Sequence, residues 1–353
     1  MKNSILIIFI ALMSLNLSCA QQTENEVNNL DNPPFTAELI IDELQIPWGF
    51  TFLPDGSMLI TEKAGQLIHF KDGKKNIVDN VPAVDDKGGN TSIIRAKLNN
   101  NSLTDIQLLY KATPNTTKGQ HFGSRIVFDD KGYLFFSIGE RGDRDVNPQD
   151  ITRDGGKIYR LNADGSIPSD NPFVNTAGAK TAIYSYGHRN PQGLAKNPMT
   201  GEIWDNEHGP QGGDEINVIE KGKNYGWPVI TYGINYSGTP ITDKTEMEGM
   251  EQPIHYWVPS IAPSGMAFVT SDKYPDWKGN SLIFPYKQPC CLLLIGSLKF
   301  QYLERLELKG NKVVYREKLM PDLGRVRDVR QAPDGFIYVA VEGKGIYKLV
   351  PKK

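Results

Sequence analysis

The stretch 186–236 concentrates side chains that could bind an anion beside a metal ion. It supplies a fixed cation, two amides and two adjacent carboxylates: Arg189, Asn190, Gln192, Asp214 and Glu215. Gly and Pro interrupt the stretch repeatedly, which predicts turns and short loops between strands. Backbone kinked in this way can turn carbonyl oxygens inward. The mixture therefore suits an anionic ligand beside an oxygen-preferring metal such as calcium. Each motif alone is more commonly a satisfied surface turn, but their combination favours a site.

The composition of the whole chain limits the class of protein. Its 353 residues allow one large domain or two ordinary ones. The net charge is −2 and no basic run stands out, so nucleic acid is not indicated as a partner. The chain has 34 Gly and 23 Pro with little helical periodicity, which favours an all-β protein rich in turns.

The amino terminus has the pattern of an export signal. Met1 and Lys2 precede a mostly apolar run, 5–17, and small residues follow it at 18–20. The apolar run is too short to span a bilayer comfortably. Either cleavage follows Ala20, or Cys19 becomes the lipid-bearing first residue of a lipoprotein, although Asn16 stands where a Leu would be expected. We therefore predict a signal peptide at 1–20, a disordered tether at 21–37 and a periplasmic or lipid-anchored protein at the cell envelope.

Two cysteines would remain in the exported chain, Cys290 and Cys291. Adjacent cysteines rarely bridge each other because the geometry is strained. We interpret them as two buried small apolar residues.

One sequence pattern recurs from residue 38 to the carboxyl terminus. An apolar strand, an Asp-Gly or related turn and a second apolar strand occur at 47–62, 121–140, 190–207, 262–284 and 325–342. Further strands are expected at 65–70, 156–161 and 345–350. Repeated units of about four strands are blades, and blades arranged radially make a β-propeller. No strand is followed by a clear amphipathic helix, which argues against a parallel α/β fold. We expect one propeller domain over 38–353.

Longer motifs make a specific resemblance. They are PWGFTFLPDG (47–56), YGHRNPQG (186–193), NEHGPQGGDEIN (206–217), KGKNYGWP (221–228) and GRVRDVRQAPDG (324–335). On these motifs the chain resembles the bacterial aldose sugar dehydrogenases, a family similar to soluble glucose and sorbosone dehydrogenases that uses pyrroloquinoline quinone (PQQ). The resemblance covers nearly all of 38–351. It implies a six-bladed β-propeller with the quinone and Ca²⁺ above the central channel. It also implies oxidation of aldose sugars at the anomeric hydroxyl to the lactone, with hydride transfer to the quinone and an external electron acceptor.

The resemblance assigns roles to individual residues. His121 matches the catalytic base, a role that suits a side chain whose ordinary pKa lies near neutrality. Six residues match quinone-contacting positions: Arg189, Asn190, Tyr236, Lys299, Arg325 and Arg327. Gly209 and Pro210 match carbonyl ligands of the calcium ion beside the quinone, whereas Glu215 and Tyr225 match a second, structural calcium site. Arg325 and Arg327 are spaced by two, so a strand would place both on one face.

Two departures from the family pattern concern the ring. After VPAVDDKG (81–88) the family usually has a Gln-Gly-Gly segment and an inner strand pair, and neither is present here. We therefore expect the weakest blade at 71–120, in a five-bladed ring or in a six-bladed ring with one incomplete blade. The segment 283–294 looks inserted, and its Pro285 and Pro289 would interrupt a central strand.

Three functions remain open at this point. The first is the PQQ-dependent dehydrogenase. The alternative is a non-catalytic propeller that binds a sugar or a protein after losing its cofactor, because fold does not fix function. The third, a metal-dependent lactonase, is disfavoured by the cationic candidates at the channel. The expected partners are an aldose and an electron acceptor, with membrane contact only through a lipid anchor, and the protein would be a monomer or homodimer.

Overall fold

The computed structural model describes residues 28–29, 33–85, 88–89, 91–123, 125–277 and 291–352. Within these ranges the regular structure is almost entirely β-strand, and the one helical turn is η1 (Pro275–Trp277). No helix in the described residues is long and apolar enough to span a bilayer. The predicted signal peptide, Cys290 and most of the segment 283–294 lie outside the described residues.

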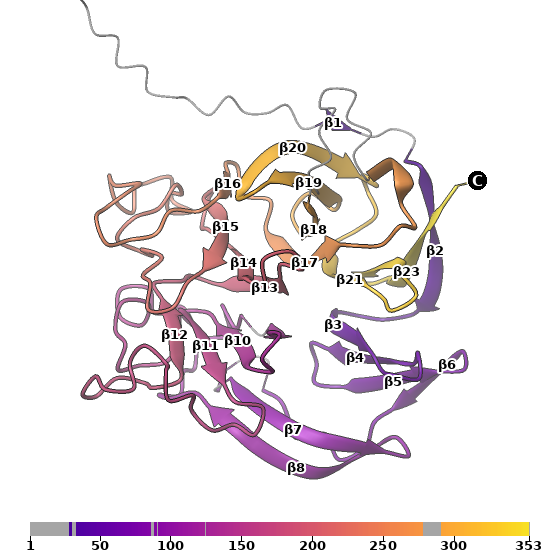
Figure 1. Ribbon diagram of the computed structural model, residues 1–353, viewed down its shortest axis with the longest axis horizontal. Helices are drawn as coiled ribbons and strands as arrows, with labels where there is room; N and C mark the ends of the chain where they lie inside the picture. Colours follow the sequence, from indigo (N-terminus) through magenta and orange to yellow (C-terminus); the bar gives the residue numbers. More distant parts are fainter. Residues whose placement is uncertain are drawn as a thin grey trace, which may run out of the picture.

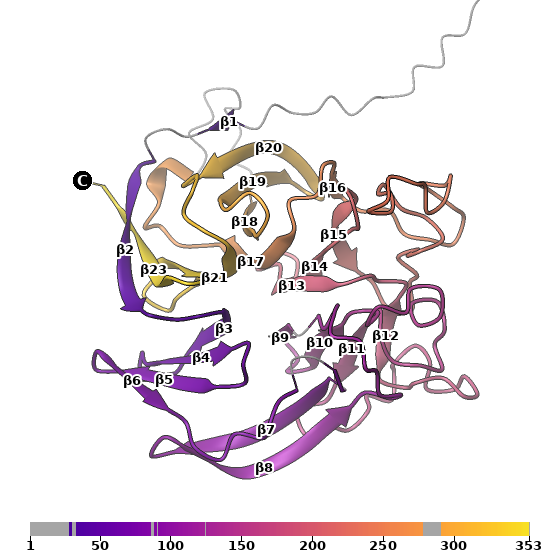
Figure 2. The same ribbon diagram turned by 180° about the vertical axis from the view of Figure 1, so that it is seen from behind.

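Five antiparallel blades surround a centre (Figures 1 and 2). The first consists of β3 (Pro47–Phe52), β4 (Met58–Glu62), β5 (Leu67–Lys71) and β6 (Lys74–Ile77). The second consists of β9 (Ile126–Phe128), β10 (Leu134–Ile138), β11 (Lys157–Leu161) and β12 (Ile183–Tyr186). The third consists of β13 (Pro191–Lys196), β14 (Ile203–Glu207), β15 (Asp214–Ile219) and β16 (His255–Trp257). The fourth consists of β17 (Pro263–Val269), β18 (Cys291–Ser297), β19 (Leu303–Lys309) and β20 (Lys312–Leu319), with β1 (Asn28–Asn29) paired in parallel to β20.

The fifth blade joins the two ends of the chain. It consists of β21 (Val326–Gln331), β22 (Ile337–Val341), β23 (Gly345–Pro351) and β2 (Phe35–Asp42), and β2 pairs antiparallel with β23. The predicted proximity of the terminal strands is confirmed. The propeller begins at Phe35, three residues before the predicted start at 38.

The predicted hairpin turns have the expected chemistry. Asp55, Asp129 and Asp334 each accept a hydrogen bond from the backbone N–H two residues later, at 2.9–3.1 Å. The glycines that follow in these three turns adopt φ of 80–83°, a conformation that favours Gly. These local signals explain why the hairpins could be located from the sequence.

Between the first two blades, the described residues form one regular element, the two-stranded hairpin β7 (Ser92–Asn99) and β8 (Ser102–Lys111), which lies at the rim (Figure 1). The ring thus has five blades, and the six-bladed count implied by the resemblance is wrong. The physical reason is the missing inner strand pair. What remains inside β7–β8 is one isolated bridge between Gly89 and Thr116 and a hydrogen bond from Ala112 N to Thr91 O (2.9 Å).

The core lies in the interfaces between neighbouring blades. The largest cluster packs the fourth blade against the fifth, with Phe35, Leu294, Val339 and Leu349 at 0–1% exposure. Hairpin β7–β8 packs on the second blade through Ile93, which belongs to a cluster with residues of β10 and β11. Cys291 is half-buried against the cluster between the third and fourth blades, in keeping with an apolar role.

Phe35 tests the closure of the ring. Its ring packs edge-on against Trp277 (5.4 Å between centroids) and is 1% exposed. We expect Phe35→Ala to lower the free energy of unfolding by about 3–5 kcal/mol in urea titration. Leu39→Ala, in the same strand but 49% exposed, should change it by less than about 0.5 kcal/mol. Equal effects of the two substitutions would show that β2 does not close the ring.

Candidate active site

His121 and Glu140 form a hydrogen-bonded pair at the start of the second blade. His121 precedes β9 with φ of +53°, and its Nδ1 contacts Oε1 of Glu140, which follows β10. Glu140 is 2% exposed, and its other oxygen has no hydrogen-bond partner in the described residues. The His121 side chain keeps 18% exposure. A buried carboxylate that orients an accessible imidazole is the arrangement of a general base and its partner.

A tight approach of the backbone supports this pair. A Cβ at Gly139 would collide with the His121 carbonyl and with Asn190 Oδ1. Only Gly therefore fits between Ile138 and Glu140, and this packing holds the backbone of His121 against the end of β10.

Glu207 positions the turn that carries Arg189 and Asn190. Its Oε2 accepts hydrogen bonds from Arg189 N (2.6 Å) and Asn190 N (3.2 Å), just before β13. The same turn contacts the His121 region, since Arg189 O accepts from Glu140 N (2.8 Å) and Asn190 Oδ1 accepts from Gly123 N (3.3 Å). The structure thus brings the predicted Arg189 and Asn190 beside the predicted base.

The Arg189 guanidinium is largely buried. It donates to the carbonyls of His208 (2.9 Å) and Gly209 (2.7 Å) and lies over the Trp227 ring at 5.3 Å. Gly209 N in turn donates to Asp214 (2.8 Å), a carboxylate that also accepts from the backbone of Ile261 and Ala262 at 2.7–2.8 Å. Asp214 therefore organises loops of two blades. The Gly209 carbonyl, a predicted calcium ligand, faces a cation, and Pro210 follows it in the same turn.

His208 was not expected from the sequence, yet it lies at the centre of the cationic groups. Its Nε2 donates to Pro263 O (2.6 Å). Burial, and then the nearby Arg189, lower the pKa of His208 to about 3, with smaller contributions from His121 and Arg327. His208 is consequently neutral at physiological pH, and groups from three blades lie within electrostatic reach of it.

Arg325 and Arg327 share one carboxylate, which agrees with the prediction that their side chains lie on one side. Both donate to Glu342 Oε2, from Nε at 3.0 and 2.8 Å. Arg325 also donates to Leu298 O (3.1 Å), the residue before Lys299, which forms no ion pair in the described part of the chain. Although burial opposes it, Arg327 and Arg325 lower the pKa of Glu342. The guanidiniums of Arg325 and Arg327 and the ammonium of Lys299 outnumber the single carboxylate of Glu342. The group therefore has a net positive charge, which suits an anionic ligand.

Tyr236 is not brought to this group. It is 76% exposed in the loop 231–250, and no hydrogen bond or ring contact joins it to the other candidates among the described residues. Its neighbour Asn235 accepts from Arg144 (2.7 Å). The structure therefore gives no support to a role for Tyr236 in cofactor binding.

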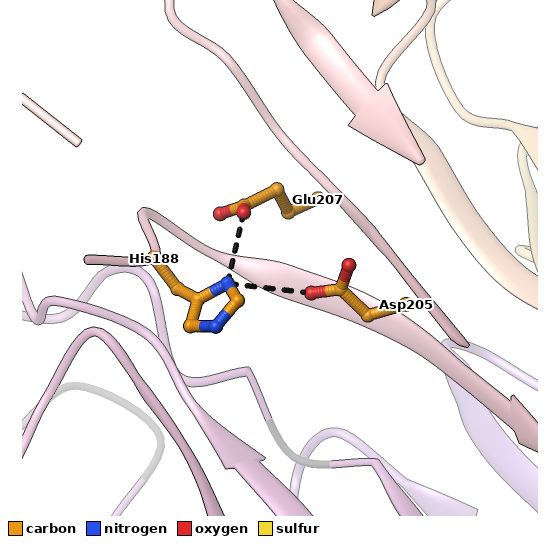
Figure 3. Close-up of side chains that lie close together, drawn as sticks. All are labelled: His188, Asp205 and Glu207. Atoms are coloured by element: carbon orange, nitrogen blue, oxygen red, sulfur yellow. Dashed lines mark hydrogen bonds and ion pairs between the residues drawn. The ribbon is translucent and has the colours of Figure 1, made fainter. Parts of the chain in front are cut away.

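An acidic cluster lies on one face of β14 and β15. Cross-strand pairing places Asp205 opposite Asn217 and Glu207 opposite Glu215. Figure 3 shows the Asp205 and Glu207 carboxylates directed at the imidazole of His188, with Nδ1 at 3.6 and 3.0 Å from their nearest oxygens. Both Asp205 oxygens are buried and lack hydrogen-bond partners in the described residues. Burial, and then Glu207, raise the pKa of both Asp205 and Glu215.

Such a cluster fits a cation, because several buried carboxylates face a single imidazole. Suitable ligand atoms of His188, Asp205 and Glu207 lie within 4.8 Å of one another. The predicted calcium ligands are adjacent: Glu215 pairs with Glu207, and the Tyr225 ring stacks on His188 at 4.5 Å. The acidic cluster thus includes Glu207, the direct cross-strand partner of the predicted Glu215.

Comparisons with known proteins identify the family of the chain. A family model described as glucose/sorbosone dehydrogenase matches residues 44–90 and 84–348. The chain is 40% identical to the aldose sugar dehydrogenase of Escherichia coli K12 over 344 residues, covering 86% of this chain and 89% of the relative. Quinoprotein glucose dehydrogenase B of Acinetobacter calcoaceticus is 31% identical over 232 residues, covering 59% of this chain and 46% of that protein.

Solved structures share the fold. The apo-form of soluble aldose sugar dehydrogenase from E. coli superposes with a TM-score of 0.81 at 38% identity, covering 90% of this chain and all of that one. The PQQ-bound form of an aldose sugar dehydrogenase from Streptomyces coelicolor has a TM-score of 0.69 at 24% identity, covering 90% and 98%. The resemblance found in the motifs is therefore confirmed, and the chain belongs to the glucose/sorbosone dehydrogenase family of oxidoreductases.

Proposed function

We propose that this protein oxidises aldose sugars at the anomeric hydroxyl, with PQQ as its cofactor. The observation that carries the proposal is the His121–Glu140 pair, an accessible base oriented by a buried carboxylate beside the turn of Arg189 and Asn190. The relatives support the substrate class and cofactor, since one is an aldose sugar dehydrogenase and another a quinoprotein.

The cationic groups fit a quinone that carries carboxylates. Arg325, Arg327 and Lys299 would bind its carboxylates, because fixed guanidiniums match carboxylate geometry. Arg189 would lie near its carbonyl oxygens, held by the His208 and Gly209 carbonyls. When bound, the quinone supplies the two-electron acceptor for the hydride that leaves the sugar.

The residues of this chain handle the proton. His121 Nδ1–H donates to Glu140, so Nε2 carries the lone pair that accepts the proton of the anomeric hydroxyl. Glu140 then stabilises the imidazolium that forms, since its carboxylate is buried against it. His208 remains neutral in this environment. Loss of the hydroxyl proton and of hydride from the anomeric carbon leaves the lactone.

The relatives do not favour the non-catalytic alternative. A protein that only binds a sugar would also not need the His121–Glu140 pair. Calcium near the acidic cluster of β14 and β15 is part of the proposal. The amino-terminal pattern supports export to the periplasm or cell envelope, where an external acceptor would reoxidise the cofactor.

Replacing the base separates chemistry from binding. We expect His121→Ala to bind PQQ as tightly as the wild type but to lower kcat by about 10²–10⁴, the usual contribution of a general base. Binding is measured by absorbance titration of the apo-protein and turnover by dye reduction with an aldose. His255→Gln, at a histidine in β16 away from the site, is the control and should retain turnover. Quinone-loaded His121→Ala with wild-type kcat would refute the assignment of the base.

Replacing Arg189 should instead weaken the binding of PQQ. Arg189→Met removes the cation that we propose lies beside the quinone oxygens, so we expect PQQ to bind about tenfold or more weakly, since a hydrogen bond to a charged group contributes about 1.5–3 kcal/mol. Titration of the apo-protein measures this directly. Wild-type affinity in Arg189→Met would exclude it from the cofactor site.

The acidic cluster should respond to calcium. Because the ion binds the folded cluster, Ca²⁺ at a hundredfold its Kd should stabilise the protein by about 2.7 kcal/mol, and a chelator should remove this effect in thermal unfolding. Asp205→Asn should abolish the response, since it neutralises a buried ligand. Asp105→Asn, at an exposed carboxylate on β8, should leave the response intact. A calcium response that survives in Asp205→Asn would place the ion elsewhere.

A further inference from the structure

The Arg141 side chain spans the sector that lacks inner strands. Arg141 follows Glu140 in the loop after β10 and is 4% exposed. Its guanidinium donates to three carbonyls: Nε to Gln120 (3.1 Å), Nη1 to Gly89 (3.2 Å) and Nη2 to Lys118 (2.9 Å). It also lies over the Phe122 ring at 4.0 Å from the centroid.

These carbonyls belong to the two chain segments that enter and leave β7–β8. In a complete blade, the N–H groups of an inner strand would satisfy such carbonyls. Here a single planar group with five N–H donors binds both segments from the neighbouring blade. Lys118 returns the contact, since its Nζ donates to Gly142 O (2.6 Å) and Asp143 Oδ1 (2.8 Å).

The contacts of Arg141 flank the proposed base on both sides. Gln120 precedes His121 and Phe122 follows it, so the guanidinium fixes the backbone before the base and the ring after it. His121 has φ of +53°, a conformation that costs free energy in a residue other than Gly and persists only where the surroundings impose it. Arg141 restrains the backbone on the side of Gln120 and Phe122, in addition to the packing at Gly139.

The space beside Arg141 shows which movement its hydrogen bonds prevent. A cavity of about 240 Å³ lies between the segment 114–118 and the loop after β10, with Thr91, Arg141 and Asp154 in its lining. Without inner strands to fill this sector, the chain leading to His121 has room to move away from Glu140. The hydrogen bonds of Arg141 and Lys118 oppose that movement on the side of the cavity.

We infer that Arg141 is a positioning residue that replaces the missing inner strands and holds His121 against Glu140. The inference rests on the proposed function of His121 as base. Arg141 does not contact substrate or cofactor in this role. It acts through the backbone of Gln120 and the ring of Phe122.

Arg141→Gly is a suitable variant because Arg141 has φ of +61°, which Gly adopts without strain. We expect kcat to fall by about 10²-fold, the effect of a base displaced by about 1 Å, with PQQ affinity changed by less than about threefold, well under the 1.4 kcal/mol that a tenfold change represents. Guanidinium ion at low millimolar concentration should restore part of kcat, because it can occupy the vacated position. Arg141→Lys should keep a low kcat, since an ammonium cannot reproduce the planar arrangement of the three hydrogen bonds.

Arg95→Ala is the matched control. Arg95 lies in β7 of the same reduced sector and also donates to a backbone carbonyl, that of Ala163 (3.0 Å), but it is exposed, and among the described residues no hydrogen bond joins it to the segment 118–122. This variant should keep wild-type kcat and should not respond to guanidinium. A similar loss in both variants would indicate general weakening of the sector and would overturn the inference.

A readout independent of activity completes the test. With ¹⁵N-labelled histidine, the Nδ1–H signal of His121 in the apo-protein reports its hydrogen bond to Glu140 and is assigned by its absence in His121→Gln. We expect the signal in the wild type and Arg95→Ala, its loss in Arg141→Gly, and its return with guanidinium. If Arg141→Gly does not fold, the same signal in Arg141→Lys decides. An unchanged signal refutes the inference, whereas a wild type that never oxidises a sugar refutes only the proposed function.

Discussion

Four blades repeat one electrostatic contact, and the site depends on it. In each, a glutamate at or just beyond the end of the second strand faces the residues that lead into the first strand of the same blade. Three of these carboxylates are buried and the fourth, Glu342, is half-buried, so each favours hydrogen-bond partners and holds those that the chain supplies there. The glutamates are Glu62, Glu140, Glu207 and Glu342.

The partners of these glutamates differ, and the differences produce the chemistry. Glu62 accepts only backbone N–H groups, from Gln45 (3.1 Å) and Ile46 (2.7 Å), so its role is structural. Glu207 binds the backbone of Arg189 and Asn190, which leaves the Arg189 side chain to point its charge elsewhere. Glu140 binds the imidazole of His121, and Glu342 binds the guanidiniums of Arg325 and Arg327. One repeated anchor thus presents the proposed base in one blade and cations in others.

The sequence predicted those parts that depend on neighbouring residues. Asp-Gly turns located the hairpins, and the spacing of Arg325 and Arg327 placed both on one side of β21. It did not predict Glu140, Glu207 or His208, because their roles arise from contacts between strands and blades. A signal was present, since a Glu recurs near the end of the second strand of four repeats, but it becomes meaningful only once the strands are aligned. The six-blade count implied by the resemblance was wrong, whereas the five inner hairpins read from the sequence agree with the five blades observed. Tyr236 stays a prediction from the motif, since it is exposed in a long loop and forms no contact with the other candidates among the described residues.

The central claim is that Glu140 makes His121 an effective base for removal of the sugar hydroxyl proton. The most direct measurement is the rate of quinone reduction in a single turnover, after rapid mixing of PQQ-loaded protein with an aldose carrying protium or deuterium at the anomeric carbon. The account predicts a primary isotope effect in the wild type. In Glu140→Gln it predicts unchanged quinone binding with reduction slowed by about 10²-fold, within the usual range for general-base catalysis. Wild-type reduction rates in quinone-loaded Glu140→Gln would contradict it.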